Sequence, residues 1–180
     1  IIITCFMVLG ALPFVLYLQA VRGKPLVILR DNQVRWFLWI VTFFILSVTI
    51  AHHINNDIGI FRALRQSAFN VVSIITGTGF SSANYASWGA FATGVFFFIM
   101  FIGGCAGSTT CSIKIFRYQV LYETAKMQMK HLIRPHGIFI ATFNGQPIND
   151  EIENSVMSFF FLFMLTFAVL AGLLHFIGLD

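Results

Sequence analysis

Apolar segments with lengths near the thickness of a bilayer constrain this chain more than any other feature. They cover residues 1–18, 36–51, 88–102 with a continuation to 116, and 156–177. About 20 helical residues cross the ~30 Å hydrocarbon core, so the first and last segments fit, and the second does so if His52 and His53 extend it. Apolar residues make up 58% of the chain and charged residues only 10%, which is outside the usual range of soluble domains. The sequence therefore predicts an all-α integral membrane protein.

Basic residues form two clusters that predict the orientation of these segments. One follows the first segment and the other follows the third; their members are Arg22, Lys24, Arg30 and Arg35, then Lys114, Arg117, Lys126, Lys130 and Arg134. Short cytoplasmic loops carry an excess of Lys and Arg, so both clusters are expected in the cytoplasm. The chain between them then crosses the membrane twice. Residues 52–87 lie outside and can only dip into the membrane and return, although Arg62 and Arg65 also fall there.

The dipping segment contains a short amphipathic pattern over residues 61–75. Its apolar positions recur at helical spacing: Phe61, Leu64, Ala68, Phe69, Val72 and Ile75. A helix of this length is too short to span a bilayer, so we expect a re-entrant helix. Its C-terminal end carries a partial negative charge and would attract cations near the membrane centre. Ser81, Ser82, Asn84 and Tyr85 would form a polar return to the surface.

An irregular stretch follows this helix directly: Thr76-Gly77-Thr78-Gly79-Phe80. Irregular backbone is tolerated at membrane depth only where it is buried in protein or faces water or an ion. Glycine permits dihedral angles that side chains forbid, and a row of carbonyl oxygens can replace the water shell of a cation. We therefore predict a backbone filter here, with a simple turn as the alternative reading.

A second run of small residues interrupts the long apolar segment after residue 102: Gly103-Gly104-Cys105-Ala106-Gly107-Ser108-Thr109-Thr110. These residues weaken a helix or bond their own backbone, so the sequence predicts a break in the helix. Small residues also mark tight helix packing in membranes, which is the competing interpretation of the run.

Both stretches, residues 69–82 and 101–110, resemble the Trk/Ktr/HKT superfamily of potassium transporters, most closely the Trk pore subunits. The resemblance implies four membrane-pore-membrane units in one chain, arranged as a pseudo-fourfold pore. It implies that Gly79 is the filter glycine and that Thr76, Gly77 and Thr78 are neighbouring carbonyl donors to K⁺. It also implies that residues 103–110 form a gating loop below the filter, although after Ser108-Thr109 this chain continues with Thr110-Cys111-Ser112, where paired small residues are usual.

The resemblance also predicts how the chain is organised. Residues 1–34 would end one repeat and form a cytoplasmic loop, 35–117 would be a complete unit with a broken second helix, 118–152 a cytoplasmic loop, and 153–180 the first helix of the next repeat. The chain would be an internal fragment of a subunit in the bacterial inner membrane. That subunit is expected to form a homodimer and to bind a cytosolic nucleotide-binding regulatory ring. No covalent cofactor, enzymatic activity or nucleic-acid partner is expected, and the net charge of +4 is too small and dispersed for nucleic acid.

Other functions are weaker readings of the same residues. A self-assembling tetrameric cation channel needs the same filter, and a secondary transporter with broken helices also uses Gly-interrupted segments. A membrane serine hydrolase would need Ser108 and a histidine base, but the expected topology puts none of the candidates at the depth of Ser108; they are His52, His53, His131 and His175.

Two smaller predictions concern the cysteines and the segment before the last helix. Cys5, Cys105 and Cys111 lack a paired spacing, so we expect reduced thiols that pack in the protein. Turns at Pro135-His136-Gly137 and Gly145-Gln146-Pro147 flank the strand-like residues 138–141. They favour a small hairpin on the inner face, with a membrane-surface helix as the alternative.

Overall fold

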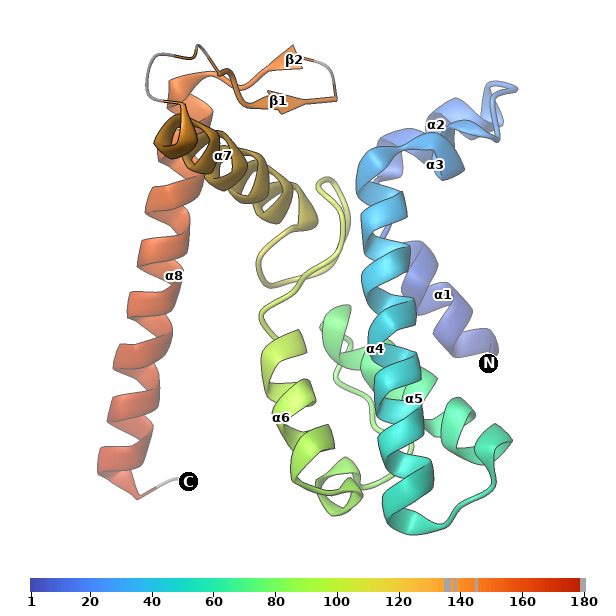
Figure 1. The fold of residues 1–180 in the computed structure, drawn as a ribbon. Helices are drawn as coiled ribbons and strands as arrows, with labels where there is room; N and C mark the ends of the chain where they lie inside the picture. Colours follow the sequence, from blue (N-terminus) through green and yellow to red (C-terminus); the bar gives the residue numbers. More distant parts are fainter. Residues whose placement is uncertain (135–136, 138, 145, 179–180) are drawn as a thin grey trace. The chain divides into compact units, whose positions relative to one another are not determined.

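The structure is a computed structural model that describes residues 1–134, 137, 139–144 and 146–178. It divides the chain into two compact units, Ile1–Phe116 and Arg117–Asp180. The elements of the first unit appear in Figure 1 in chain order: α1 (Ile2–Gly10), α2 (Phe14–Val21), α3 (Val27–Arg30), α4 (Asn32–Asn56), α5 (Ile60–Ile75), the 3₁₀ helix η1 (Tyr85–Trp88), α6 (Ala90–Ile99) and the start of α7 (Ile115–Ile133).

The first apolar segment is not the single helix that the sequence predicted. It forms α1 and α2, whose axes differ in direction by 100°. Pro13 precedes α2 as its N-cap. Proline has no N–H and disfavours helical dihedrals in the residue before it, so the helix ends ahead of Pro13 and a new one begins after it.

Helix α4 is longer than the predicted segment 36–51. It begins after Asp31, whose side chain accepts a hydrogen bond of 3.1 Å from the Val34 N–H, and such a cap satisfies one of the free N–H groups at a helix start. It ends at Asp57, which has a left-handed backbone (φ 49°). With 25 residues, α4 is long and apolar enough to cross a membrane. Among the described residues, Glu151–Ile177 also passes this test, and α1 with α2 passes as a bent pair.

The core of the first unit lies where α4 packs against α5 and α6, with α1 against α5. Its buried side chains include Phe37, Val48, Val71, Ile75 and Ile99. Helix α5 covers the residues predicted to form a short amphipathic helix; of its apolar positions, Val72 and Ile75 are buried, whereas Phe61 and Leu64 are exposed (86% and 39%). The helix also buries small and polar residues, among them Ser67, Asn70 and Ser73.

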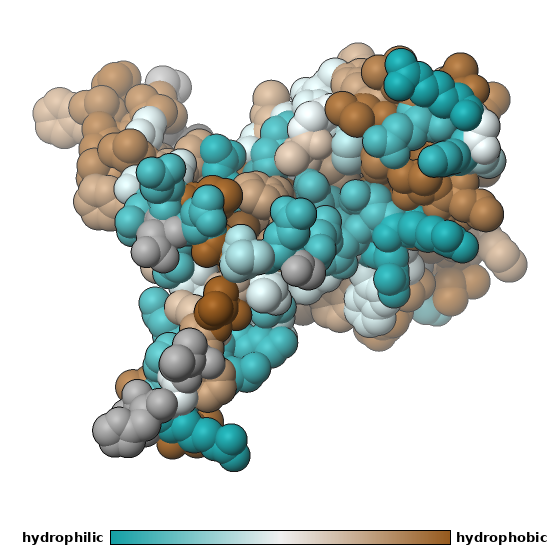
Figure 2. Space-filling model, turned by 90° about the horizontal axis from the view of Figure 1, so that it is seen from above, coloured by the Kyte–Doolittle hydropathy of each residue, from teal (hydrophilic) through white to brown (hydrophobic). Residues whose placement is uncertain are grey.

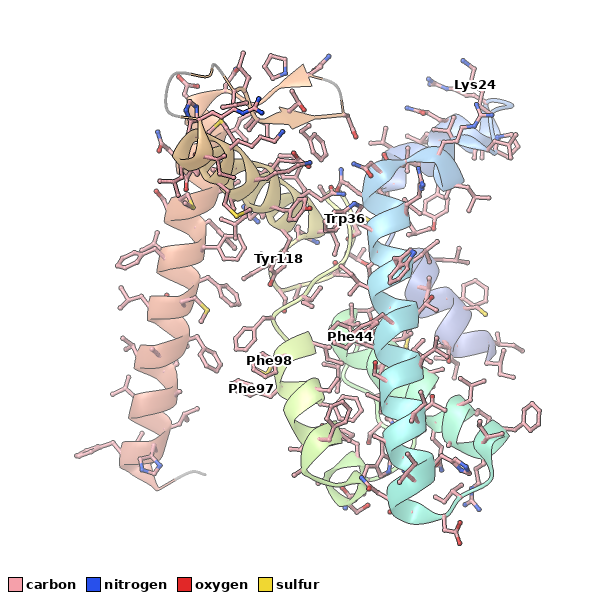
Figure 3. The ribbon with its side chains drawn as sticks, viewed as in Figure 1. Lys24, Trp36, Phe44, Phe97, Phe98 and Tyr118 are labelled. Atoms are coloured by element: carbon pink, nitrogen blue, oxygen red, sulfur yellow. The ribbon has the colours of Figure 1, made fainter. Side chains whose placement is uncertain are left out.

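The α2–α3 end of the first unit carries exposed basic side chains. They are Arg22, Lys24, Arg30 and Arg35, and Figure 3 shows Lys24 at this end. The view from above shows hydrophilic side chains gathered there (Figure 2). The first basic cluster of the sequence therefore lies together at the end of the unit where α4 begins.

The second unit contains most of α7, an antiparallel hairpin and α8 (Asp150–Ile177). Within it, the Arg117 guanidinium lies 3.6 Å from the centre of the Phe159 ring. The hairpin pairs β1 (Thr142–Phe143) with β2 (Gln146–Pro147). The predicted strand is wrong for residues 139–141, which precede β1 and are not strand. The predicted positions Pro135, His136, Ile138 and Gly145 lie outside the described residues.

Candidate ion-binding site

Residues 57–88 leave the end of α4 and return to the same end. At the return, the rings of His52 and Trp88 are stacked with centroids 3.9 Å apart. The Asn55 Nδ2 group donates a hydrogen bond of 3.1 Å to the carbonyl of Trp88. Because α5 starts just after α4 and η1 comes back to it (Figure 1), the intervening segment has the geometry of a re-entrant hairpin.

His52 holds this hairpin together at its open end. The side chain is buried, with Nε2 3.1 Å from Gln66 Oε1 on α5 and Nδ1 3.0 Å from Asn56 Nδ2 on α4. Buried polar groups are costly unless they are hydrogen-bonded, and here both ring nitrogens have partners. His52 is therefore a packing residue that ties the middle of α5 to the C-terminal part of α4.

The chain stops being helical at Thr76. The N–H groups of Thr76, Gly77 and Thr78 still donate to carbonyls of α5, at 2.9, 3.0 and 2.9 Å. Gly77 and Gly79 then adopt positive φ angles of 71° and 78°, a conformation that costs a residue with a Cβ roughly 1–2 kcal/mol. The two glycines therefore permit the turn of the backbone away from the helix axis.

The carbonyl oxygens of this stretch are open to a ligand. Within the described parts of the chain, no group donates a hydrogen bond to the carbonyls of Thr76, Gly77, Thr78, Gly79 or Phe80. The Thr76 hydroxyl is occupied by the Val72 carbonyl at 2.8 Å and by the Thr78 hydroxyl at 2.7 Å. A row of open carbonyls just beyond a helix C-terminus presents partial negative charge, which suits a cation.

Asn70 ties the polar return to α5, and sequence reasoning gave it no role. Its side chain is buried and accepts a hydrogen bond of 3.0 Å from the Ser82 N–H. Its Nδ2 group donates to the Gln66 carbonyl at 3.1 Å and lies 3.4 Å from Ser82 Oγ. The signal in the sequence was a polar position, Asn70, between the apolar residues Phe69 and Val71 of the predicted re-entrant helix, because polar residues inside a membrane are costly.

Replacing Asn70 by leucine in the full-length protein should loosen the stretch between Thr76 and Ser82. The Ser82 N–H would lose its acceptor; because Ser82 is exposed and water can replace the acceptor, the cost is about 0.5–1.5 kcal/mol. We expect a lower unfolding temperature and weaker discrimination between K⁺ and Na⁺ in a competition uptake assay. Asn149→Leu is a matched control, since Asn149 is exposed and its side chain makes no cap hydrogen bond. Equal behaviour of the two variants would remove Asn70 from the support of this stretch.

The break after α6 is wider than the predicted residues 103–110. It runs from Met100 to Lys114, between α6 and α7. Its two arms are joined by hydrogen bonds from Gly103 N–H to the Ile113 carbonyl (2.9 Å) and from Ile113 N–H to the Phe101 carbonyl (3.2 Å). The intramembrane loop, as we call residues 100–114, is thus a closed structure with its own backbone pairing.

The intramembrane loop is bonded to the break between α1 and α2. The Cys105 N–H donates to the Ala11 carbonyl at 3.0 Å, the Thr109 hydroxyl donates to the Gly10 carbonyl at 3.1 Å, and the Phe14 N–H donates to the Gly107 carbonyl at 3.1 Å. Each break therefore supplies hydrogen-bond partners for backbone groups of the other break.

The intramembrane loop also reaches the filter stretch. A Cβ placed on Gly77 would lie 3.5 Å from Cys111 Cβ, so these two backbones are neighbours. Cys111 falls one residue beyond the predicted loop and is exposed, as is Cys5, whereas Cys105 is buried. The prediction of packed thiols is therefore right for Cys105 and wrong for Cys5 and Cys111; all three are free.

Ser108 is not arranged as a nucleophile with a histidine base. Its hydroxyl donates to the Cys105 carbonyl at 2.6 Å and lies 2.9 Å from Thr110 Oγ1. Its other side-chain contact within the described residues is Lys114 Nζ at 3.4 Å. The hydroxyl therefore serves the fold of the intramembrane loop, together with Thr110 and Lys114.

Known proteins resemble this chain over nearly all its length. The family TrkH, described as cation transport protein, matches residues 1–175. The Trk system potassium uptake protein TrkI of Halomonas elongata is 44% identical over 175 residues, and TrkH of Escherichia coli K12 is 27% identical over 170. These alignments cover 97% and 93% of this chain but 35% of each relative, so the chain spans about a third of their length.

A solved structure has the same fold. The crystal structure of the potassium transporter TrkH from Vibrio parahaemolyticus superimposes with a TM-score of 0.86 at 28% sequence identity. The match covers 96% of this chain and 38% of that one.

Proposed function

This chain belongs to the TrkH family of cation transport proteins, and on that premise we propose that it forms one part of a potassium-uptake pore. It is a helical membrane protein. The observation that carries the proposal is the row of carbonyls at the end of α5. Those of Thr76, Gly77, Thr78 and Gly79 accept no hydrogen bond from the described residues, and such oxygens can replace the water of a bare cation.

The proposed path for the ion runs from the filter stretch to the intramembrane loop. We assign residues 76–80 to the filter and residues 103–110, with their neighbours up to Lys114, to a gate. The contact between Gly77 and Cys111 supports this order, because an ion leaving the filter would meet the intramembrane loop next. On this proposal, α5 is the pore helix and residues 35–117 are one membrane-pore-membrane unit.

The whole subunit is proposed to act in the bacterial inner membrane as a homodimer with a cytosolic nucleotide-binding regulatory ring. The resemblance to Trk pore subunits supports these partners. The gathering of exposed Arg22, Lys24, Arg30 and Arg35 at one end of the first unit supports a cytoplasmic position for that end.

Potassium uptake in a transport-deficient host tests the function. The full-length gene product should restore growth at low K⁺ and accumulate Rb⁺, whereas a host with empty vector should not. A sodium-free medium is a further arm, because a sodium-coupled secondary transporter would lose uptake in it. Failure to accumulate Rb⁺ despite normal membrane insertion would contradict the proposal.

Residues 1–180 reconstituted alone should carry no selective K⁺ flux. A carbonyl cage needs oxygens from all sides of the ion, and this chain offers one filter run and therefore one wall. A liposome assay with valinomycin as the positive control measures the flux. Robust K⁺-selective flux from this piece would favour the self-assembling tetrameric channel instead.

A further inference from the structure

The ammonium group of Lys114 sits in a cluster of oxygens on the intramembrane loop. Nζ donates to the Ser108 carbonyl at 3.2 Å, to Thr110 Oγ1 at 3.1 Å and to Ser108 Oγ at 3.4 Å, and it also contacts the Thr110 carbonyl. Thr110 is buried and Lys114 is half-buried. These four oxygens, which we call the loop cage, come from only two residues.

The loop cage has the chemistry of a site for a monovalent cation. Its ligands are neutral carbonyl and hydroxyl oxygens, the ligand class that coordinates K⁺ in filters. A lysine ammonium is a compact, singly charged cation, so its position shows that the oxygens converge on one positive charge. The hydrogen bonds it makes are charge-assisted and stronger than neutral ones.

The loop cage also lies close to the filter stretch. Thr110 is adjacent in sequence to Cys111, and Cys111 lies against Gly77 at the deep end of the filter stretch. Gly104 N–H donates to Thr110 Oγ1 at 2.9 Å, which fixes that hydroxyl on the packed side of the intramembrane loop. The loop cage is therefore separated by one residue of chain from the contact with the filter stretch.

We propose that Ser108 and Thr110 form a second potassium site and that Lys114 is a tethered competitor for it. While the ammonium occupies the loop cage, it holds the intramembrane loop in the described conformation. When the side chain withdraws, K⁺ takes its place and the loop conformation becomes sensitive to the ion. The site rests on the function proposed above, because it serves ions that cross the pore.

Alkylation of Cys111 in the full-length protein tests this site. Cys111 is exposed and neighbours the loop cage, so its reaction rate with N-ethylmaleimide, followed by mass spectrometry of its peptide, reports movement of the intramembrane loop. The rate is measured in potassium chloride and in N-methylglucamine chloride. In the wild-type protein the alkylation rates in the two salts should be similar, because the Lys114 ammonium occupies the loop cage in both.

In the Lys114→Met variant, Cys111 should react with N-ethylmaleimide about tenfold faster in N-methylglucamine chloride, because the intramembrane loop has lost the equivalent of one charge-assisted hydrogen bond. In potassium chloride the alkylation rate of this variant should fall toward the wild-type rate, because K⁺ occupies the loop cage. Lys114→Arg keeps the charge and should stay near the unmodified rate. Lys126→Met is the matched control, because Lys126 is an exposed lysine on α7 paired with Glu123, and its loss should leave both rates unchanged.

Two results would overturn the proposal. If Cys111 of the Lys114→Met variant reacts faster by the same factor in both salts, Lys114 only stabilises the intramembrane loop and the loop cage does not bind K⁺. If the rate does not rise in either salt, Lys114 does not hold the intramembrane loop. If the Lys114→Met protein aggregates on size exclusion, Lys114→Gln, which keeps a polar side chain of similar length, is used in its place. The same two alkylation results would then overturn the proposal. Absence of Rb⁺ uptake by the unmodified protein would count against the proposed function, whereas potassium-dependent alkylation of the variant would still support the cage.

Discussion

Replacing Gly79 by aspartate in the full-length protein should abolish selective potassium uptake, and Gly79→Ser should weaken discrimination against Na⁺ by about tenfold or more. Gly79 has φ 78° and a Cβ there would meet no atom within 4 Å. A steric clash is therefore not the cause of the expected loss. A side chain would strain the left-handed backbone by roughly 1–2 kcal/mol and turn the carbonyl away from its present direction, while aspartate adds a fixed charge beside the ions.

Gly23→Ser is the matched control for this prediction. Gly23 also has a positive φ (93°) with nothing within 4 Å of its Cβ position, but it lies in the turn after α2, away from the filter stretch. Rb⁺ uptake in competition with Na⁺ should be unchanged by Gly23→Ser and altered by Gly79→Ser. A well-expressed Gly79→Asp protein with full selectivity would remove Gly79 from the filter.

Substitutions at two glycines of the intramembrane loop should distinguish a role of residues 103–110 in gating from a role in helix packing. A Cβ on Gly107 would meet no atom within 4 Å, whereas a Cβ on Gly104 would lie 2.7 Å from the Ala11 carbonyl oxygen. We expect Gly107→Phe to assemble normally and to lower K⁺ flux by about tenfold, because an added side chain projects into open space at the proposed gate. Gly104→Val should overpack the contact with the α1–α2 break, at a cost of about 1–3 kcal/mol, and lower the yield of folded protein.

The measurement is flux per reconstituted molecule beside the yield from size exclusion. If residues 103–110 serve only for packing, Gly107→Phe would lower the yield and leave the flux per molecule unchanged. A phenylalanine at the φ of 75° that Gly107 adopts would be strained, so a small loss of stability is expected and the flux per molecule is the deciding quantity.

The position of α5 could be predicted from the sequence, but which of its side chains are buried could not. A helix expected over residues 61–75 is α5, but its apolar spacing does not tell which positions are buried, and Phe61 and Leu64 are exposed. In a membrane the surrounding lipid is as apolar as a protein core, so apolar side chains do not mark the inner face. Small and polar residues mark it instead, as Ser67, Asn70 and Ser73 do in this helix.

The contacts that shape the candidate site were less predictable because they join residues far apart in the chain. The glycines of residues 76–80 and 103–110 indicated irregular backbone, since glycine at these spacings weakens a helix. They could not indicate that the intramembrane loop would extend to Lys114 or that Lys114 would reach back to Ser108. In the sequence, a lysine next to an apolar segment predicts only which side of the membrane the loop lies on. Its hydrogen-bond partners are known only once the structure is known.

The bonds between the two breaks have a consequence for biosynthesis. The carbonyls of Gly10 and Ala11 find their partners in Thr109 and Cys105, which the ribosome adds much later. Unpaired backbone groups are costly in hydrocarbon, by several kcal/mol each, so α1 and α2 cannot settle into lipid as a finished pair when they are first made. They must wait in a hydrated or protein-lined environment until the following unit has inserted. The order of synthesis thus makes maturation of the earlier helices depend on the later loop, and a truncation before Cys105 should leave α1 and α2 as substrates for membrane proteases.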